Sequence, residues 1–526
     1  MWWLLLSLAF GAPDVAELSV RAEALDVEAM AHADAGRYAE AARVANEVLA
    51  LLEGQDVDPA EIGRVALFAA EMSASAGDLD AAESQVRAEL TRRDDGEEGS
   101  EMGTAEALLV LGGVLRDRSD FDGASAHLER ALEIASRHRD GGALKGHIQT
   151  RIGLMQCDWG QLKACRASLE ASLSTTVEVY GPDHYNVGIN LNNLGFALEQ
   201  AGDAATAETY YLRALEHVSR TLGPDHLQVG AMLNNLGILE SQRGDFEAAR
   251  AYHSRALAVR EPVLGPNHPD VARSLANLAG VAHELTDFET AGRLYARAVA
   301  ILGDSIAGAD VLRNHAISLL DQDRIAEAEG FLQRARAIYD ATLPPEHPDH
   351  GYIQTDLANL ASRRGDLDLA VAHQRMAIQT AIAAYGRDHS IVARQMATLA
   401  GFEVERGHHP VAWRLIDQAI GALEGGEGTD PPSLISPLTV LIRIAADLGD
   451  FVTAEATARR ALDIATATYG DDHPRVALIL HSRAVLAQTD GRFDEAMADF
   501  DRALEIYTAT YGPDHQDVWA VQLERA

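Results

Sequence analysis

Gly223-Pro224-Asp225-His226, followed by Leu233-Asn234-Asn235-Leu236-Gly237 and Gly244-Asp245, is the stretch of sequence that decides the fold. The same arrangement begins 42 residues earlier at Gly181 and 42 residues later at Gly265. The loop histidine marks each copy of the pattern, at His184, His226, His268, His347, His389, His473 and His515. A fixed period of this size is typical of a repeat array, in which each unit packs only on its neighbours.

The composition favours helices in such an array. Of the 526 residues, 47% are hydrophobic and only 6% are aromatic, so the core must be mostly Ala and Leu. A chain of this length would ordinarily suggest roughly three or four globular domains. A repeat array instead grows as one continuous body, and Ala, Leu, Glu and Arg are strong helix formers.

Each unit is predicted to be a pair of helices around a short turn. Ile189–Gln200, helix A, and Ala204–Thr221, helix B, both carry apolar residues at three-and-four spacing, which makes one apolar stripe. Small residues, Gly195 on helix A and Ala207 on helix B, are expected where the two helices approach most closely. The A–B turns align on residues suited to a left-handed backbone: Gly36, Gly77, Ser119, Gly160, Gly202, Gly244, Thr286, Asp323, Gly365, Gly407, Gly449 and Gly491.

These turns predict about twelve helix-turn-helix units, one of them shortened, between Thr286 and Asp323. The expected fold is all-α, a right-handed α-solenoid, with a last helix that caps its C-terminal end. The apolar run Trp2–Phe10 is too short to span a bilayer, which takes ~20 residues. Residues 1–12 fit a short signal peptide in outline, although no Lys or Arg precedes the run. Export to the periplasm or medium is therefore favoured over the cytoplasm; the alternative is a first helix packed on the repeat behind it.

The net charge of −36 argues against nucleic acid and anionic membrane surfaces as partners, because both are bound by Lys and Arg. Two interpretations of the acidic surplus stay open. It can simply keep the surface soluble, or it can favour a basic partner, whose binding would weaken with salt.

The units resemble tetratricopeptide repeats (TPRs), because Leu194-Gly195, Leu198, Ala207, Tyr211 and Ala214 fall where that family places its packing residues. The 42-residue period and the Gly-Pro-Asp-His loop resemble the repeats of kinesin light chains. On this resemblance, residues 13–175 hold divergent repeats and residues 176–302 hold repeats of the kinesin-light-chain type. Residues 303–526 hold further repeats, including the short one and the capping helix.

The resemblance implies a concave groove lined by the A helices, which binds extended peptides or partner helices through asparagines. The matching positions here are Asn192, Asn193, Asn234, Asn235, Asn277 and Asn314. An amide pairs with both the N–H and the C=O of a peptide. The alternative is that these amides tie adjacent repeats together. Asp356 and Thr398 replace Asn further along, which puts groove contacts there in doubt.

Other motifs suggest no chemistry. Pro345–His350 holds several metal-ligand types but is the loop motif with an insertion, so neither a metal site nor a cofactor is expected. Cys165 takes the place of Ala207 and is expected in the core; Cys157 is expected to face the groove, so no disulfide is predicted. No phosphate-binding loop or nucleophile elbow occurs. The prediction is a non-enzymatic protein- or peptide-binding scaffold; the alternative is a regulatory or sensor module acting with a kinase or protease on another chain.

Overall fold

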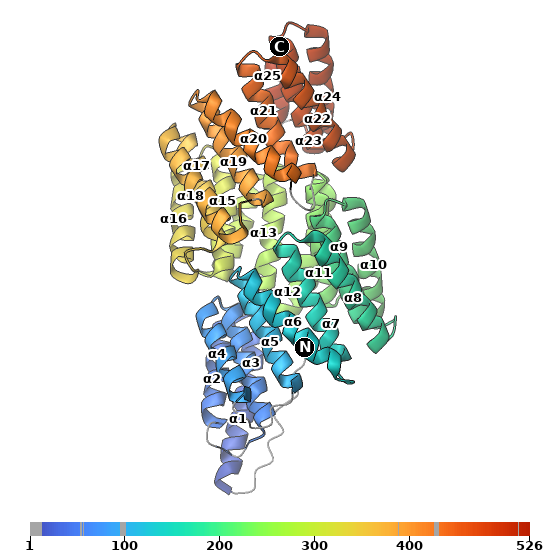
Figure 1. The fold of residues 1–526 in the computed structure, drawn as a ribbon, viewed down its shortest axis with the longest axis vertical. Coiled ribbons are helices and arrows are strands. Elements are labelled where there is room, and N and C mark those ends of the chain that lie inside the picture. Colours follow the sequence, from blue (N-terminus) through green and yellow to red (C-terminus); the bar gives the residue numbers. More distant parts are fainter. Residues whose placement is uncertain are drawn as a thin grey trace. The chain divides into compact units, whose positions relative to one another are not determined.

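The computed structural model describes residues 13–52, 55, 57–94, 101–387, 389–425, 431–513 and 515–525. Every regular element in this described part is helical, comprising 25 α-helices and one short 3-10 helix (Figure 1). The predicted all-α repeat solenoid is therefore confirmed. Residues 1–12, the predicted signal peptide, lie outside the described residues.

The helices alternate between the A and B positions of successive repeats. The A helices are α1 (Pro13–Asp34), α3 (Pro59–Ser75), α5 (Glu101–Asp117), α7 (Gly142–Asp158), α9 (Tyr185–Gln200), α11 (Leu227–Gln242), α13 (Pro269–Glu284), α15 (Ile306–Asp321), α17 (Pro348–Arg363), α19 (Ser390–Glu405), α21 (Ile435–Asp447), α23 (Pro474–Thr489) and α25 (Gln516–Arg525). The B helices are α2 (Tyr38–Leu52), α4 (Leu79–Asp94), α6 (Phe121–Arg137), α8 (Leu162–Tyr180), α10 (Ala204–Leu222), α12 (Phe246–Leu264), α14 (Phe288–Leu302), α16 (Ile325–Thr342), α18 (Leu367–Tyr385), α20 (His409–Gly425), α22 (Phe451–Tyr469) and α24 (Phe493–Tyr511). The 3-10 helix η1 (Pro431–Leu434) precedes α21.

The chain forms two compact units. The first comprises the described residues up to Ala197 with Arg213–Leu227 and Val259–Val271. The second comprises Leu198–Leu212, Gln228–Ala258 and the described residues from Ala272 onward.

All twelve predicted turn residues have a positive φ, between 56° and 89°. Nine are glycines, which adopt this conformation without steric cost. The other three are Ser119, Thr286 and Asp323, and they keep the same turn at some strain. An aspartate often follows the turn and caps helix B: Asp245 accepts a hydrogen bond from the Ala248 N–H at 2.9 Å, and Asp450 accepts one from Thr453 at 3.1 Å.

The core follows the predicted alternation of small and large side chains. Ala207, Ala249 and Ala291, at the small position of helix B, are fully buried, and so is the larger Tyr211. The close approach is clearest one repeat earlier. A Cβ built on Gly153 of α7 would lie 2.7 Å from Leu169 Cγ on α8, so only glycine allows this spacing.

The short repeat loses its residues from helix B and from the loop that follows. Helix α14 has 15 residues, whereas α10 and α12 have 19 each. The Gly-Pro-Asp-His loop is replaced by Gly303 and Ser305, and the Ser305 hydroxyl caps α15 by accepting from Gly308 N–H at 3.1 Å. The A helices before and after α14, which are α13 and α15, both keep 16 residues. Residues on these A helices therefore keep their register.

Candidate functional site

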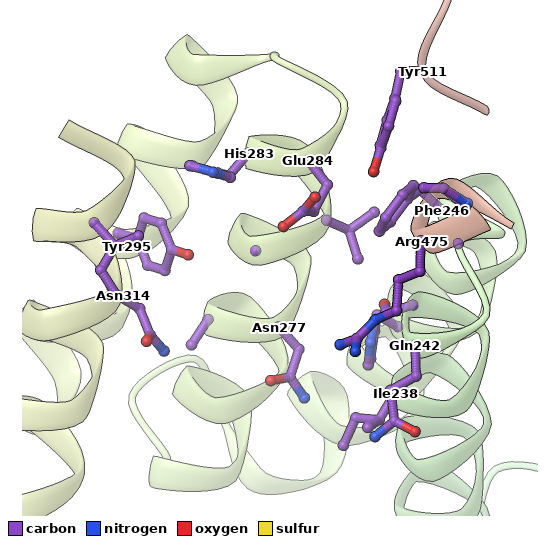
Figure 2. A pocket seen from close by; sticks show the side chains of 18 of the residues that line it. Ile238, Gln242, Phe246, Asn277, His283, Glu284, Tyr295, Asn314, Arg475 and Tyr511 are labelled. Atoms are coloured by element: carbon purple, nitrogen blue, oxygen red, sulfur yellow. The ribbon is translucent and has the colours of Figure 1, made fainter. Parts of the chain in front are cut away.

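A pocket of about 550 Å³ opens in the second unit, over the inner faces of α11, α13 and α15 (Figure 2). These A helices contribute Ile238, Gln242, Asn277, Glu284 and Asn314. Phe246 of α12 and Tyr295 of α14 add aromatic surface. The remaining wall comes from far along the chain, with His473, Arg475 and Tyr511. This volume lies within the range that is common for ligand-binding clefts.

The far wall is held by one of the marker histidines. His473 Nδ1 accepts the N–H of Arg475 at 3.0 Å and so caps α23. Its Nε2 lies 2.9 Å from the carbonyl oxygen of Gln242, 231 residues earlier. Since Nδ1 accepts, the neutral ring carries its proton on Nε2 and donates it to that carbonyl. His473 therefore attaches the start of α23 to the end of α11.

Similar contacts recur at other marker histidines. In the first unit, His268 and Pro269 pack on the Gly36 turn. In the second, the backbone of Glu284 hydrogen-bonds His515. A tyrosine four residues earlier stacks on the ring of His184, His389, His473 and His515, with centroids 4.1–4.7 Å apart. The sequence analysis uses these histidines only as markers of the repeat. Their capping role could have been predicted, because each directly precedes the first residue of a helix and that first residue is often a proline.

The six predicted asparagines fall into different settings. Asn192 and Asn193 lie in the first unit, and Asn234, Asn235, Asn277 and Asn314 lie in the second. The structure brings Asn277 and Asn314 to the pocket. Asn234 is buried, and its Oδ1 accepts a hydrogen bond from Asn277 Nδ2 at 2.7 Å. For this pair the amides do connect adjacent A helices, which is the alternative role, while Asn277 keeps its own Oδ1 for other partners.

Asp356 stands where Asn314 stands one repeat earlier, and it forms an ion pair with Arg313. Its Oδ2 accepts from Arg313 Nε at 2.6 Å across two adjacent A helices, and both side chains are largely buried. Desolvation raises the pKa of Asp356, and the Arg313 charge opposes that rise. The ion pair therefore uses the position that asparagine occupies in earlier repeats.

The pocket contains charges of both signs. Arg475 lies over the Tyr469 ring, 5.3 Å from its centroid. The Glu284 side chain remains exposed at the surface, but nearby protein atoms displace part of the water around it. This desolvation raises the pKa of the Glu284 carboxyl group. His283 opposes this rise, whereas the Asp321 and Asp517 carboxylates add to it. Burial likewise raises the pKa of Tyr295 and Tyr511, so both phenols stay protonated and can donate.

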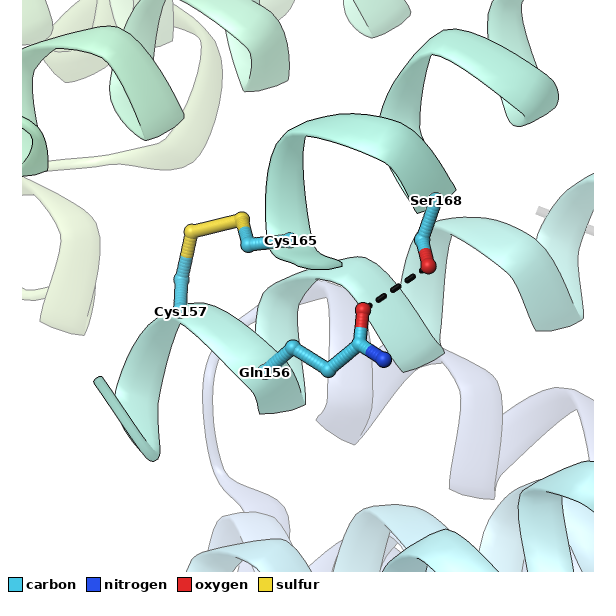
Figure 3. The surroundings of a disulfide bond; sticks show 4 residues. All are labelled: Gln156, Cys157, Cys165 and Ser168. Atoms are coloured by element: carbon cyan, nitrogen blue, oxygen red, sulfur yellow. Dashed lines mark hydrogen bonds between the residues drawn. A yellow bond between two sulfur atoms is a disulfide. The ribbon is translucent and has the colours of Figure 1, made fainter. Parts of the chain in front are cut away.

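The prediction for the cysteines was wrong in one respect. Cys165 is fully buried as expected, but Cys157 forms a disulfide with it, with the Cα atoms 5.2 Å apart (Figure 3). Cys157 lies on the last turn of α7 and faces helix B, not the groove. Glu199 shows the same orientation one repeat later, because its carboxylate accepts from the Tyr211 hydroxyl of α10 at 2.6 Å.

Other candidate sites have structural roles. His347 caps α17, and His350 lies 3.5 Å from Asp340. Within the described ranges, no three His, Cys, Asp or Glu side chains are grouped so as to hold a metal ion. No helix in that part of the chain is long and apolar enough to cross a membrane.

Comparison with known proteins places the array in a family. A tetratricopeptide repeat model matches residues 187–261, 229–304, 308–383 and 435–509, more than half of the chain. Two further models of that description match residues 104–138 and 22–47.

Individual relatives either match a small part of the chain or match most of it at low sequence identity. A stretch of 95 residues is 32% identical to the protein-lysine N-methyltransferase SMYD4 of Danio rerio; it covers 18% of this chain and only 13% of that protein. A Podosopora anserina protein described as a kinesin light chain with nearly identical TPR-like repeats is 21% identical, with a TM-score of 0.31, over 38% of this chain and 94% of that one. Yeast Tom70 is 14% identical, with a TM-score of 0.44, over 96% of both chains.

The model matches agree with the structure, in which paired helices recur with the period of the sequence. Arrays of this kind serve as scaffolds for interactions between proteins, so protein partners follow from the repeats themselves. The chain belongs to the tetratricopeptide repeat family.

Proposed function

We propose that this protein is a non-enzymatic scaffold that captures an extended segment of a partner protein along the inner faces of its A helices. Asn192, Asn193, Asn234, Asn235, Asn277 and Asn314 are the residues proposed to bind the segment. The observation that carries the proposal is the placement of Asn277 and Asn314 at one pocket over three consecutive A helices. Asn277 Oδ1 is available to accept a peptide N–H, because the interaction with Asn234 uses only its Nδ2.

The charge of the chain supports a basic partner. The net charge is −36, and the pocket contains Glu284, with Asp321 and Asp517 close enough to raise its pKa. A cationic segment would relieve this repulsion. Its association is expected to weaken as salt rises, because screening shortens the range of charge interactions to ~8 Å at physiological ionic strength.

In the test, the tagged chain is mixed with a lysate of its native source, and the proteins that it captures are identified by mass spectrometry. The variant Asn277→Ala with Asn314→Ala, which alters the two asparagines at the pocket, is expected to lose the partner that the wild type captures, with unchanged helicity by circular dichroism. The matched control is Asn267→Ala, an exposed loop asparagine, which is expected to retain the partner. Retention by the double variant would refute the groove; loss of helicity would assign the two amides to the stability of the array.

A further inference from the structure

The contacts described between distant repeats share one arrangement, in which the start of an A helix lies on the A–B turn of an earlier repeat. His473, at the start of α23, donates to the carbonyl oxygen of Gln242, two residues before the turn residue Gly244. His515, at the start of α25, hydrogen-bonds the backbone of Glu284, at the same place in the next repeat. Both pairs are 231 residues apart. The A–B turn of one repeat is thus covered by the loop that begins the A helix six repeats later.

Docking on a turn buries the loop histidine. His268, His473 and His515 lie on earlier turns and are only 5%, 6% and 6% exposed, respectively. His184 is half-buried and His226 is exposed, although both loops have the sequence Gly-Pro-Asp-His. The local structure of His184 matches that of His473, because its Nδ1 accepts an N–H at 3.3 Å and its ring stacks on a tyrosine, with centroids 4.5 Å apart. The His184 loop therefore already has the form that docks elsewhere in the chain.

Two A–B turns in the last repeats have no such cover. A Cβ built on Gly244 would lie 2.8 Å from an atom of α23, whereas nothing lies within 4 Å of one on Gly449 or Gly491. The carbonyl oxygens two residues before these turns belong to Asp447 and Thr489, and within the described residues neither accepts a hydrogen bond. The last carbonyls of a helix need partners from outside the helix. These two turns therefore present the acceptor that His473 uses at the earlier turn.

Apolar side chains beside the two turns are exposed as well. Phe246, the first residue of helix B after the covered turn, is 7% exposed and stacks on Tyr511, with ring centroids 5.6 Å apart (Figure 2). Phe493 has the same position in the last repeat but is 66% exposed. Leu448 and Val452, which flank the other uncovered turn, are also exposed. Large apolar side chains grouped on a surface favour an interaction with another protein.

We propose that a second copy of the chain covers these turns, with its His184 loop on the Gly449 turn and its His226 loop on the Gly491 turn. The two loops are 42 residues apart and so are the two turns, so both contacts can form together. Each histidine would donate to the helix-end carbonyl beside its turn, as His473 does within the chain. Because the contact joins different surfaces of the two copies, it is heterologous and can add further copies. The interface lies at the A–B turns and goes beyond the proposed capture of a partner by the A helices.

The experiment is sedimentation velocity of the chain over a range of concentrations, in which dimers and larger species are expected to increase with concentration. The turn variant is Val452→Asp with Phe493→Asp, and the loop variant is Tyr185→Asp with His226→Asp. Tyr185 directly follows the first loop histidine and is exposed, and aspartate suits both loop positions at a helix start. Each double variant should weaken self-association at least about tenfold, with unchanged helicity by circular dichroism. Met376→Asp, at an exposed apolar residue in the middle of α18, is the matched control and should associate like the wild type.

Mixing the two double variants tests that the contact is heterologous. Each variant keeps one intact surface, so an equal mixture should form a dimer and nothing larger. A wild type that stays monomeric at its highest soluble concentration would overturn the proposal. So would a mixture that stays monomeric, or a Met376→Asp control that loses as much association as the turn variant. None of these results would bear on partner capture, which is measured separately with the Asn277 and Asn314 variant.

Discussion

At the scale of single residues, the same left-handed turn has different importance in different repeats. Gly244 and Gly365 have φ of 78° and 79°, so alanine should be equally strained at both, by roughly 1–2 kcal/mol. A Cβ on Gly244 would lie 2.8 Å from Pro474 Cδ, whereas nothing lies within 4 Å of one on Gly365. Gly244→Ala is therefore expected to lower the free energy of unfolding by about 1–3 kcal/mol more than Gly365→Ala, as measured by denaturant unfolding. Equal losses would show that Pro474 does not rest on this turn.

Local requirements could be predicted from the sequence, but contacts between distant repeats could not. A turn needs a left-handed residue at a fixed place, so the period identified even Ser119, Thr286 and Asp323, which are not glycines. The period gives the register along the chain and does not say which distant repeats meet. The contact of His473 with Gln242, and hence the far wall of the pocket, was for that reason not predictable.

At the scale of the helical hairpin, the disulfide links the end of α7 to the start of α8. It closes a loop of eight residues, for which the loss of unfolded-state entropy corresponds to about 2–3 kcal/mol. Cys157→Ser is expected to lower the free energy of unfolding by about this amount under oxidising conditions. Cys165→Ala introduces the residue type that occupies the equivalent position one repeat later, Ala207. It should lower the free energy of unfolding by no more than this amount.

Reduction supplies the control for the hairpin. With dithiothreitol present, the wild type should gain 2 Da in intact mass for one disulfide and fall to the stability of Cys157→Ser. A wild type whose mass and stability are both unchanged by reduction would show that the bond does not form. The orientation of Cys157 was predicted wrongly because the residue lies next to a tight turn. There a residue on helix A faces helix B of its own repeat, as Glu199 also does.

At the scale of the whole molecule, the contact between distant repeats in the second unit should depend on pH. His473 is neutral when it accepts from Arg475 N–H and donates to the Gln242 carbonyl. Desolvation lowers its pKa from the ordinary value near 6.5, the positive charge of Arg475 lowers it further, and the Gln242 hydrogen bond opposes both. The unfolded chain therefore takes up this proton at a higher pH than the folded chain does. The contribution of His473 to stability is complete above about pH 6.5 and is lost as the pH falls through the lowered folded-state pKa.

His473→Asn separates this contact from helix capping, because asparagine remains a good N-cap but cannot reach the Gln242 carbonyl in the same way. We expect it to cost about 0.5–1.5 kcal/mol at pH 8, the net contribution of one hydrogen bond. Its difference from the wild type should shrink on titration from pH 8 to pH 5, as measured by denaturant unfolding. His184→Asn is the matched control, since His184 also caps its helix and stacks on a tyrosine. A difference that stays constant with pH would mean that the neutral ring of His473 does not hold the distant repeats together, and the pocket would then lose the contact that fixes its far wall.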